Sequence, residues 1–172
     1  KISLPVYIAG DEPGEYISTT VGESAYANYQ PDANAVALWH LDEIDGNGPY
    51  IKDSSGNGND AISVGGTYIS DGKMGGARKL SDPSSYIVAN DIDLANKNFT
   101  ISFWVKRNKI DDTFDYVLVI NAQSPGGYLF VGDMEMEGWH NLVFTFDNSS
   151  KEFSTYLDSV FYGSETLSEL SF

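Results

Sequence analysis

The sequence contains no cysteine, and this absence removes disulfide bonds, thiolate metal sites and cysteine nucleophiles from consideration. It also lacks any apolar run of about 18 residues, the length that a transmembrane helix requires. The chain does not open with a charged segment followed by an apolar stretch, as a secretory leader does. We therefore expect no membrane insertion by these residues, and we expect any leader or anchor to lie outside them.

Positive charge is scarce in this chain. Ten Lys and Arg stand against twenty-five Asp and Glu, which gives a formal net charge of −15. A protein this acidic repels nucleic-acid phosphates and acidic lipid headgroups at long range. No basic cluster reverses the charge locally. We therefore expect no nucleic-acid partner.

Short apolar runs with a period of two recur along the chain between turn residues. Residues 98–106, "NFTISFWVK", place Phe99, Ile101 and Phe103 on one face, which is the pattern of a β-strand. Residues 139–147, "WHNLVFTFD", repeat it. Further candidate strands are residues 35–41, 85–89, 115–120, 127–131 and 152–158.

This many short strands, without a helical period between them, predicts an all-β fold of the sandwich or barrel type. The main pattern begins after "YQPDANA", which reads as a linker. We therefore expect an N-terminal arm or extra hairpin over residues 1–34 and one β-domain over residues 35–172.

Five motifs occur in a fixed order: "VALWHLDEIDGNG", "DSSGNGND", "GKMGGARKL", "NFTISFWVK" and "GWHNLVFTFD". Their order resembles the laminin-G-like branch of the concanavalin A-like lectin and glucanase superfamily, over about residues 35–158. The resemblance implies a two-sheet antiparallel jelly-roll sandwich, usually part of a larger secreted or surface protein. Members use this fold for glycan binding, protein binding, adhesion or catalysis, so it does not define the function.

The chain stops before the last strand that such domains usually carry. A sandwich without this strand has unpaired backbone on the neighbouring strand, which can pair with another segment. We expect the N-terminal arm, at residues 4–9, to supply that strand within the chain or to a neighbouring subunit by strand addition.

Residues 53–60, "DSSGNGND", combine turn residues with many side-chain oxygens. Asn57 followed by Gly58 is a strong signal for a tight turn, and Asp53 can accept hydrogen bonds from the following amides. Crowded carboxylates and carbonyls can also hold calcium, which takes six to eight oxygen ligands. Both interpretations stay open, and the calcium site would use Asp42, Asp53, Asn57 and Asp60.

Aromatic residues in loops are the candidate contacts for a bound glycan. Tyr50, Tyr68 and Tyr128 each lie near Asp or Asn residues, so these three are the candidate ligand site, with ordinary anchoring of their loops as the alternative. Trp39, Trp104 and Trp139 lie inside strand motifs, and we expect them to pack in the core.

Catalysis has weaker support in the sequence. Asp133, Glu135 and Glu137 alternate as in the acidic strand of retaining glucanases, but their order differs from the "E-x-D-x-E" pattern. His40 and His140 suggest two partly exposed strand histidines rather than a metal or acid centre. We expect no enzyme.

The sequence predicts an extracellular or cell-surface recognition or adhesion module that binds a glycan or a surface protein. The alternatives are a structural subunit assembled by strand addition and a glycoside hydrolase.

Overall fold

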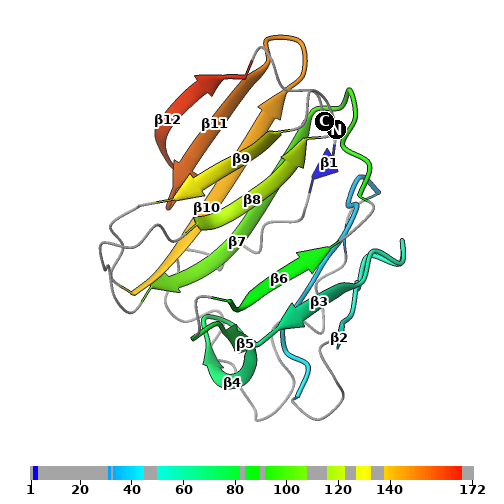
Figure 1. Ribbon diagram of the computed structural model, residues 1–172, viewed down its shortest axis with the longest axis vertical. Coiled ribbons are helices and arrows are strands. Elements are labelled where there is room, and N and C mark those ends of the chain that lie inside the picture. Colours follow the sequence, from blue (N-terminus) through cyan, green and yellow to red (C-terminus); the bar gives the residue numbers. More distant parts are fainter. Residues whose placement is uncertain are drawn as a thin grey trace. The chain divides into compact units, whose positions relative to one another are not determined.

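A computed structural model describes residues 2–3, 31, 33–44, 50–81, 84–89, 92–107, 116–122, 127–132 and 138–167. For residues 2–3, 107, 116–122 and 127–132 it describes the backbone alone. Throughout these residues the chain is all-β and contains no helix (Figure 1). The expectation of an all-β fold is therefore confirmed.

The chain divides into two compact units. One unit joins Lys1–Val6 with Asp93–Phe172, and the other spans Tyr7–Ile92.

The first unit contains a five-stranded sheet in the order β1-β7-β10-β11-β12. Its first strand runs parallel to β7, and the other neighbours are antiparallel. The bounds are β1 Ile2–Ser3, β7 Phe99–Arg107, β10 Gly138–Asp147, β11 Glu152–Leu157 and β12 Val160–Thr166. A separate antiparallel pair is formed by β8 (Tyr116–Ala122) and β9 (Gly127–Gly132).

Alternating apolar residues explain why β10 is the central strand of this sheet. Leu142, Phe144 and Phe146 share one face and are buried, as the period of two predicts. Phe146 stacks on Phe99 of β7 at 5.2 Å between ring centroids, and Phe144 stacks on Phe153 of β11 at 5.7 Å. These rings hold three neighbouring strands in register.

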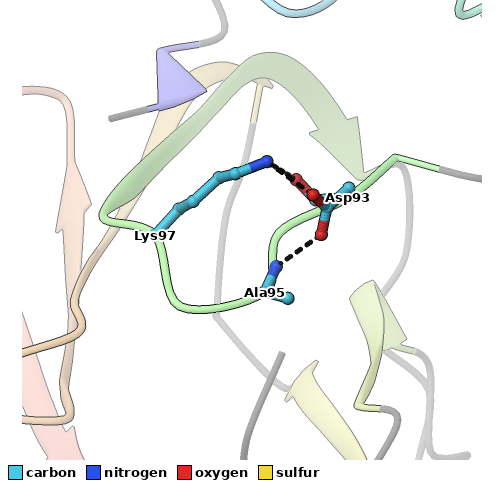
Figure 2. Close-up of polar contacts among 3 residues, drawn as sticks. All are labelled: Asp93, Ala95 and Lys97. Atoms are coloured by element: carbon cyan, nitrogen blue, oxygen red, sulfur yellow. Dashed lines mark hydrogen bonds and ion pairs between the residues drawn. The ribbon is translucent and has the colours of Figure 1, made fainter.

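A compact turn precedes β7. The Asp93 carboxylate accepts hydrogen bonds from the Ala95 amide at 3.0 Å and from Lys97 Nζ at 2.7 Å (Figure 2). Lys97 Nζ also donates to the Asp93 carbonyl at 2.9 Å. Because Asp93 is exposed and Lys97 is only partly buried, this ion pair fixes the local turn and adds little to overall stability.

The second unit contains a three-stranded antiparallel sheet in the order β2-β3-β6 and a hairpin of β4 and β5. The bounds are β2 Tyr50–Ile51, β3 Ala61–Val64, β4 Thr67–Gly72, β5 Gly75–Lys79 and β6 Tyr86–Ala89. Its buried apolar residues include Ala37, Leu38, Ile51 and Ala61.

Residues 35–41 do not form the strand that their sequence predicts. The segment makes an isolated bridge between Trp39 and Asp53, and Leu38 accepts a hydrogen bond from the Ser54 amide at 2.8 Å. Side chains of the 53–60 loop bind the other backbone groups, as described below. The prediction was wrong because these side chains take the place of a neighbouring strand.

The N-terminal arm is described only at β1, which pairs with β7. This pairing is at the opposite edge of the sheet from β12. Residues 4–9, which we expected to supply a missing strand, lie outside the described residues. The side chains of Trp39, Trp104 and Trp139 are half-buried, so these residues lie at the margin of the packed interior and not fully inside it.

Gly76 is a site where the packing of the second unit can be tested. A Cβ at this position would lie 2.5 Å from Tyr68 Cε2 and 3.0 Å from the backbone Cα of Asp42. We expect Gly76→Ala to lower the free energy of unfolding by about 1 to 3 kcal/mol, measured by denaturant titration. Gly163→Ala is the matched control because open space surrounds that position. Equal stability of the two variants would contradict this packing.

Candidate functional site

Asp53 is the centre of the loop formed by residues 53–60. Its side chain is buried, with 4% of the residue exposed. Oδ1 accepts hydrogen bonds from the Leu38 amide at 2.9 Å and the Ser55 amide at 2.8 Å. Oδ2 accepts from Ser55 Oγ at 2.8 Å and the Asn59 amide at 2.9 Å. Protein donors therefore use all four acceptor positions of this carboxylate.

Two asparagine amides continue the same network. Asn57 Nδ2 donates to the Ala35 carbonyl at 2.8 Å, and Asn59 Nδ2 donates to the Val36 carbonyl at 2.8 Å. The loop thus binds the extended segment 35–38 through side chains at several points. Trp39 adds a bond in which the loop is the acceptor, since the Trp39 Nε1 donates to the Asn59 carbonyl at 2.8 Å.

Asp60 closes the loop. Its Oδ1 accepts a hydrogen bond from the Asp53 amide at 2.8 Å, and its Oδ2 accepts one from the Tyr50 hydroxyl at 2.7 Å. The bond to Asp60 raises the pKa of Tyr50, so this phenol stays neutral at physiological pH. Two of the predicted site groups, Tyr50 from the ligand set and Asp60 from the metal set, therefore bind each other.

In the structure these contacts form a hydrogen-bonded turn around Asp53, which is the first of the two interpretations that the sequence leaves open. A calcium ion would need lone pairs that the amides of Leu38, Ser55 and Asn59 already occupy. Asn57 directs its amide nitrogen toward carbonyls of residues 35 and 36. Within the described ranges, no group of three His, Asp or Glu side chains is placed to share a metal ion.

The remaining predicted residues lie elsewhere in the second unit or outside the description. Asp42 is exposed, and its backbone lies beside Gly76 and close to the Tyr68 ring. Neighbouring Glu43 is held by Arg78, whose Nη2 donates to the Glu43 carbonyl and lies 3.8 Å from Oε2. The side chain of Tyr128 and the residues Asp133, Glu135 and Glu137 lie outside the described part.

The pKa of Asp53 reflects two opposing effects. Burial raises it, but the hydrogen bonds from Leu38, Ser55 and Asn59 outweigh burial and hold the pKa below its ordinary value. The bonds from Asp53 and Tyr50 lower the pKa of Asp60 in the same way. Both carboxylates thus bind protons more weakly in the folded state than in the unfolded chain.

This difference predicts a loss of stability in acid. Because the folded-state pKa values are lowered, the stabilisation is fully present above the unfolded pKa of about 4 and is lost as pH falls through the folded values. We expect the unfolding midpoint to fall steeply below about pH 4. Asp53→Asn should show a flatter decline in the same thermal titration. Parallel curves for the two proteins would contradict the assignment.

The geometry also predicts the response to metal removal. Since Asp53 is saturated by protein donors, we expect the midpoint of thermal unfolding to be the same in calcium and in EDTA. A rise of several degrees in calcium that Asp53→Ala abolishes would instead show that this carboxylate binds the ion.

A second candidate site is the hairpin of β11 and β12 in the first unit. Its two-residue turn, Asp158 and Ser159, has positive φ values of 49° and 67° at both positions, as a type I′ turn requires. The Asp158 carboxylate accepts a hydrogen bond from the Asn141 amide at 2.9 Å and lies 2.7 Å from His140 Nδ1. The Asp158 amide donates to the Asn141 carbonyl at 2.9 Å. Strand β10 thus fixes the turn.

Three consecutive apolar residues follow this turn and are exposed. The exposed fractions are 69% for Val160, 57% for Phe161 and 60% for Tyr162. The register shifts here, because Tyr156 pairs with Phe161 and Thr155 pairs with Gly163, which leaves Tyr162 as the extra residue of a bulge. Phe161 meets Tyr156 edge to face at 5.6 Å. We name Tyr156, Val160, Phe161 and Tyr162 the hairpin patch.

Sequence reasoning did not identify the hairpin patch. The signal was present in "VFY", because three adjacent apolar residues cannot all face a core from a regular strand. A bulge exposes such a run, and bulges are over-represented at sheet edges and next to active sites. Comparison with models of protein families and with curated proteins gives no match for this chain.

Proposed function

We propose that this chain is a non-catalytic recognition module of an extracellular or cell-surface protein and that it binds its partner at the hairpin patch. The exposure of Val160, Phe161 and Tyr162 supports this proposal more than any other observation. Exposure of large apolar residues to water is unfavourable, and a contiguous exposed set is typical of an interaction site. The fixed turn at Asp158 limits the entropy lost on binding.

For the fold we propose the jelly-roll sandwich of laminin-G-like domains. The support is the order of the five sequence motifs and the antiparallel strand order β7-β10-β11-β12, in which "NFTISFWVK" and "GWHNLVFTFD" are paired neighbours. In such domains the residues that bind a ligand lie on loops that a rigid scaffold holds in place. The proposed partners are a glycan or a surface protein.

The proposal is tested by binding measurements on two arrays, one of glycans and one of peptides. The variant Phe161→Ser, Tyr162→Ser removes most of the hairpin patch and leaves the buried face of the sheet intact. We expect wild type to bind members of one array and the variant to lose roughly tenfold or more in affinity, with an unchanged unfolding midpoint. Binding that the variant retains in full would contradict the proposal, and so would an absence of binding to both arrays.

A second candidate function is a structural subunit of a surface filament, pilus or virion. It is favoured by the position of β12 at the end of the sheet, where only β11 is its neighbour among the described strands. Light scattering separates the two functions. The recognition module is expected to stay monomeric at micromolar concentration, whereas a filament subunit would form assemblies whose mass grows with concentration.

A further inference from the structure

We propose that the partner at the hairpin patch is an extended, positively charged protein segment that pairs with β12 as an added strand. This inference rests on the proposed function and names the class of partner. It follows from the edge of β12 that no other described strand occupies, from the apolar residues beside it and from the charge around it.

The backbone of β12 supplies the first argument. Leu167 donates its amide to the Lys151 carbonyl at 2.8 Å, so Leu167 turns its backbone groups toward the side of β11. Because antiparallel strands alternate between inward and outward backbone groups, Thr166 and Ser164 direct their N–H and C=O away from β11. Among the described strands none lies on that side. The groups are spaced as a further strand requires.

The hairpin patch supplies the second argument. Val160, Phe161 and Tyr162 occupy one end of the same strand whose other end carries Ser164 and Thr166. A segment paired along β12 would therefore place apolar side chains against the patch while its backbone follows the edge. Glycans have no backbone amides to match such an edge, so the combination favours a peptide chain.

Charge supplies the third argument. Glu165 lies between the two outward-directed residues and is exposed, and Glu152, opposite Thr166 in the register, is also exposed. Strand β12 contains neither Lys nor Arg. The neighbouring Lys151 is occupied, because its Nζ donates to Asn148 Oδ1 at 2.7 Å. The edge therefore favours a segment with Lys or Arg.

The same charges disfavour a second copy of this chain as the occupant. Pairing β12 with β12 of another copy would bring glutamates of both chains to one edge, and each chain carries a net charge of −15. Like charges at paired positions destabilise a strand pair. Over longer range, the negative field accelerates encounters with a cationic segment.

The experiment uses a synthetic peptide of alternating Lys and Val, eight residues long, titrated into the chain by calorimetry. Three further ligands complete the design: an alternating Glu and Val peptide, a Lys and Val peptide with alternate amides N-methylated, and the glycan array. The chain is used as wild type, Phe161→Ser and Ser164→Pro. The proline removes an N–H that is directed away from β11, so the β11–β12 pairing is kept.

We expect the Lys and Val peptide to bind, with affinity that falls as salt rises. N-methylation of the peptide, Ser164→Pro and Phe161→Ser should each weaken binding at least tenfold, and the Glu and Val peptide should not bind. Because the N-methylated peptide tests the edge in unaltered protein, the result does not depend on how well Ser164→Pro folds.

Five results would overturn the inference. Equal binding of the N-methylated peptide would show side-chain docking without strand pairing, and equal binding of the acidic peptide would remove the role of charge. Dimerisation of wild type that Ser164→Pro abolishes would make a second copy the occupant. Glycan binding that depends on Phe161, without peptide binding, would overturn the inference and leave the proposed function standing. Absence of all binding would overturn both.

Discussion

Replacement of Asp53 by alanine is expected to lower the free energy of unfolding by about 3 to 5 kcal/mol. The carboxylate is buried and accepts four hydrogen bonds, from Leu38, Ser55 and Asn59. Without it, three backbone amides lose their acceptor in a buried loop. Denaturant titration of wild type and variant measures the change, and the thermal midpoint should fall by about 10 °C.

Two controls sharpen this result. Asp53→Asn keeps the shape of the side chain but presents an NH₂ group to amide donors, so it should recover only part of the loss. Asp93→Ala removes an exposed carboxylate that also accepts an amide hydrogen bond, and its effect should be much smaller. If Asp53→Ala is as stable as Asp93→Ala, the loop does not hold the segment 35–38 in the way described.

Replacement of Phe144 by alanine is expected to lower the free energy of unfolding by about 3 to 5 kcal/mol. Its side chain is fully buried on β10 and contacts Phe153 and Phe103, at ring-centroid distances of 5.7 Å and 5.9 Å. Removing the ring leaves a cavity among residues of three strands. Chemical denaturation of the pure variant measures the loss.

Phe161→Ala is the matched control, because it removes the same side chain from an exposed position. Its stability should change by less than about 1 kcal/mol, while its affinity for the proposed partner falls at least tenfold. Phe144→Ala should show the reverse when tested below its unfolding transition. A loss of stability in Phe161→Ala as large as that in Phe144→Ala would show that Phe161 belongs to the core.

The strands that carry the strongest period of two were predictable from the sequence. Residues 98–106 and 139–147 form the adjacent strands β7 and β10, and Phe99, Phe144 and Phe146 lie on the buried face as expected. Here apolar residues recur at every second position, so burial of the face that they share determines both the strand and its orientation.

The segment 35–41 was not predictable by the same reasoning. Its apolar content suggests a strand, but most of its backbone bonds are to side chains, those of Asn57 and Asn59 and the carboxylate of Asp53. The period of a sequence reports which residues are buried and carries no information about which groups bind the backbone. The tight turn at 57–58 was visible, whereas the bond between Tyr50 and Asp60 required the fold.

The hairpin patch was missed for a related reason. A single sequence does not reveal where a bulge interrupts a strand, and without the bulge "VFY" reads as a strand with one face buried. The two-residue turn also uses Asp158 and Ser159 instead of the Asn-Gly pair that signals a hairpin. The contact of Asp158 with Asn141, a residue distant in sequence, stabilises this turn.

The loop of residues 53–60 and the hairpin patch have different roles in this account. The loop uses its polar side chains to hold its own unit together, so few of them are available to a ligand. The hairpin patch exposes apolar side chains, and β12 has only β11 as a neighbour among the described strands. Recognition is therefore assigned to the hairpin, and structural stability to the loop.

The most direct test is an NMR titration of ¹⁵N-labelled chain with the alternating Lys and Val peptide, combined with amide hydrogen exchange. We predict the largest chemical-shift changes over Val160–Thr166 and slower exchange at the amides of Ser164 and Thr166. Changes confined to residues 50–60, with no protection along β12, would contradict the assignment of recognition to the hairpin.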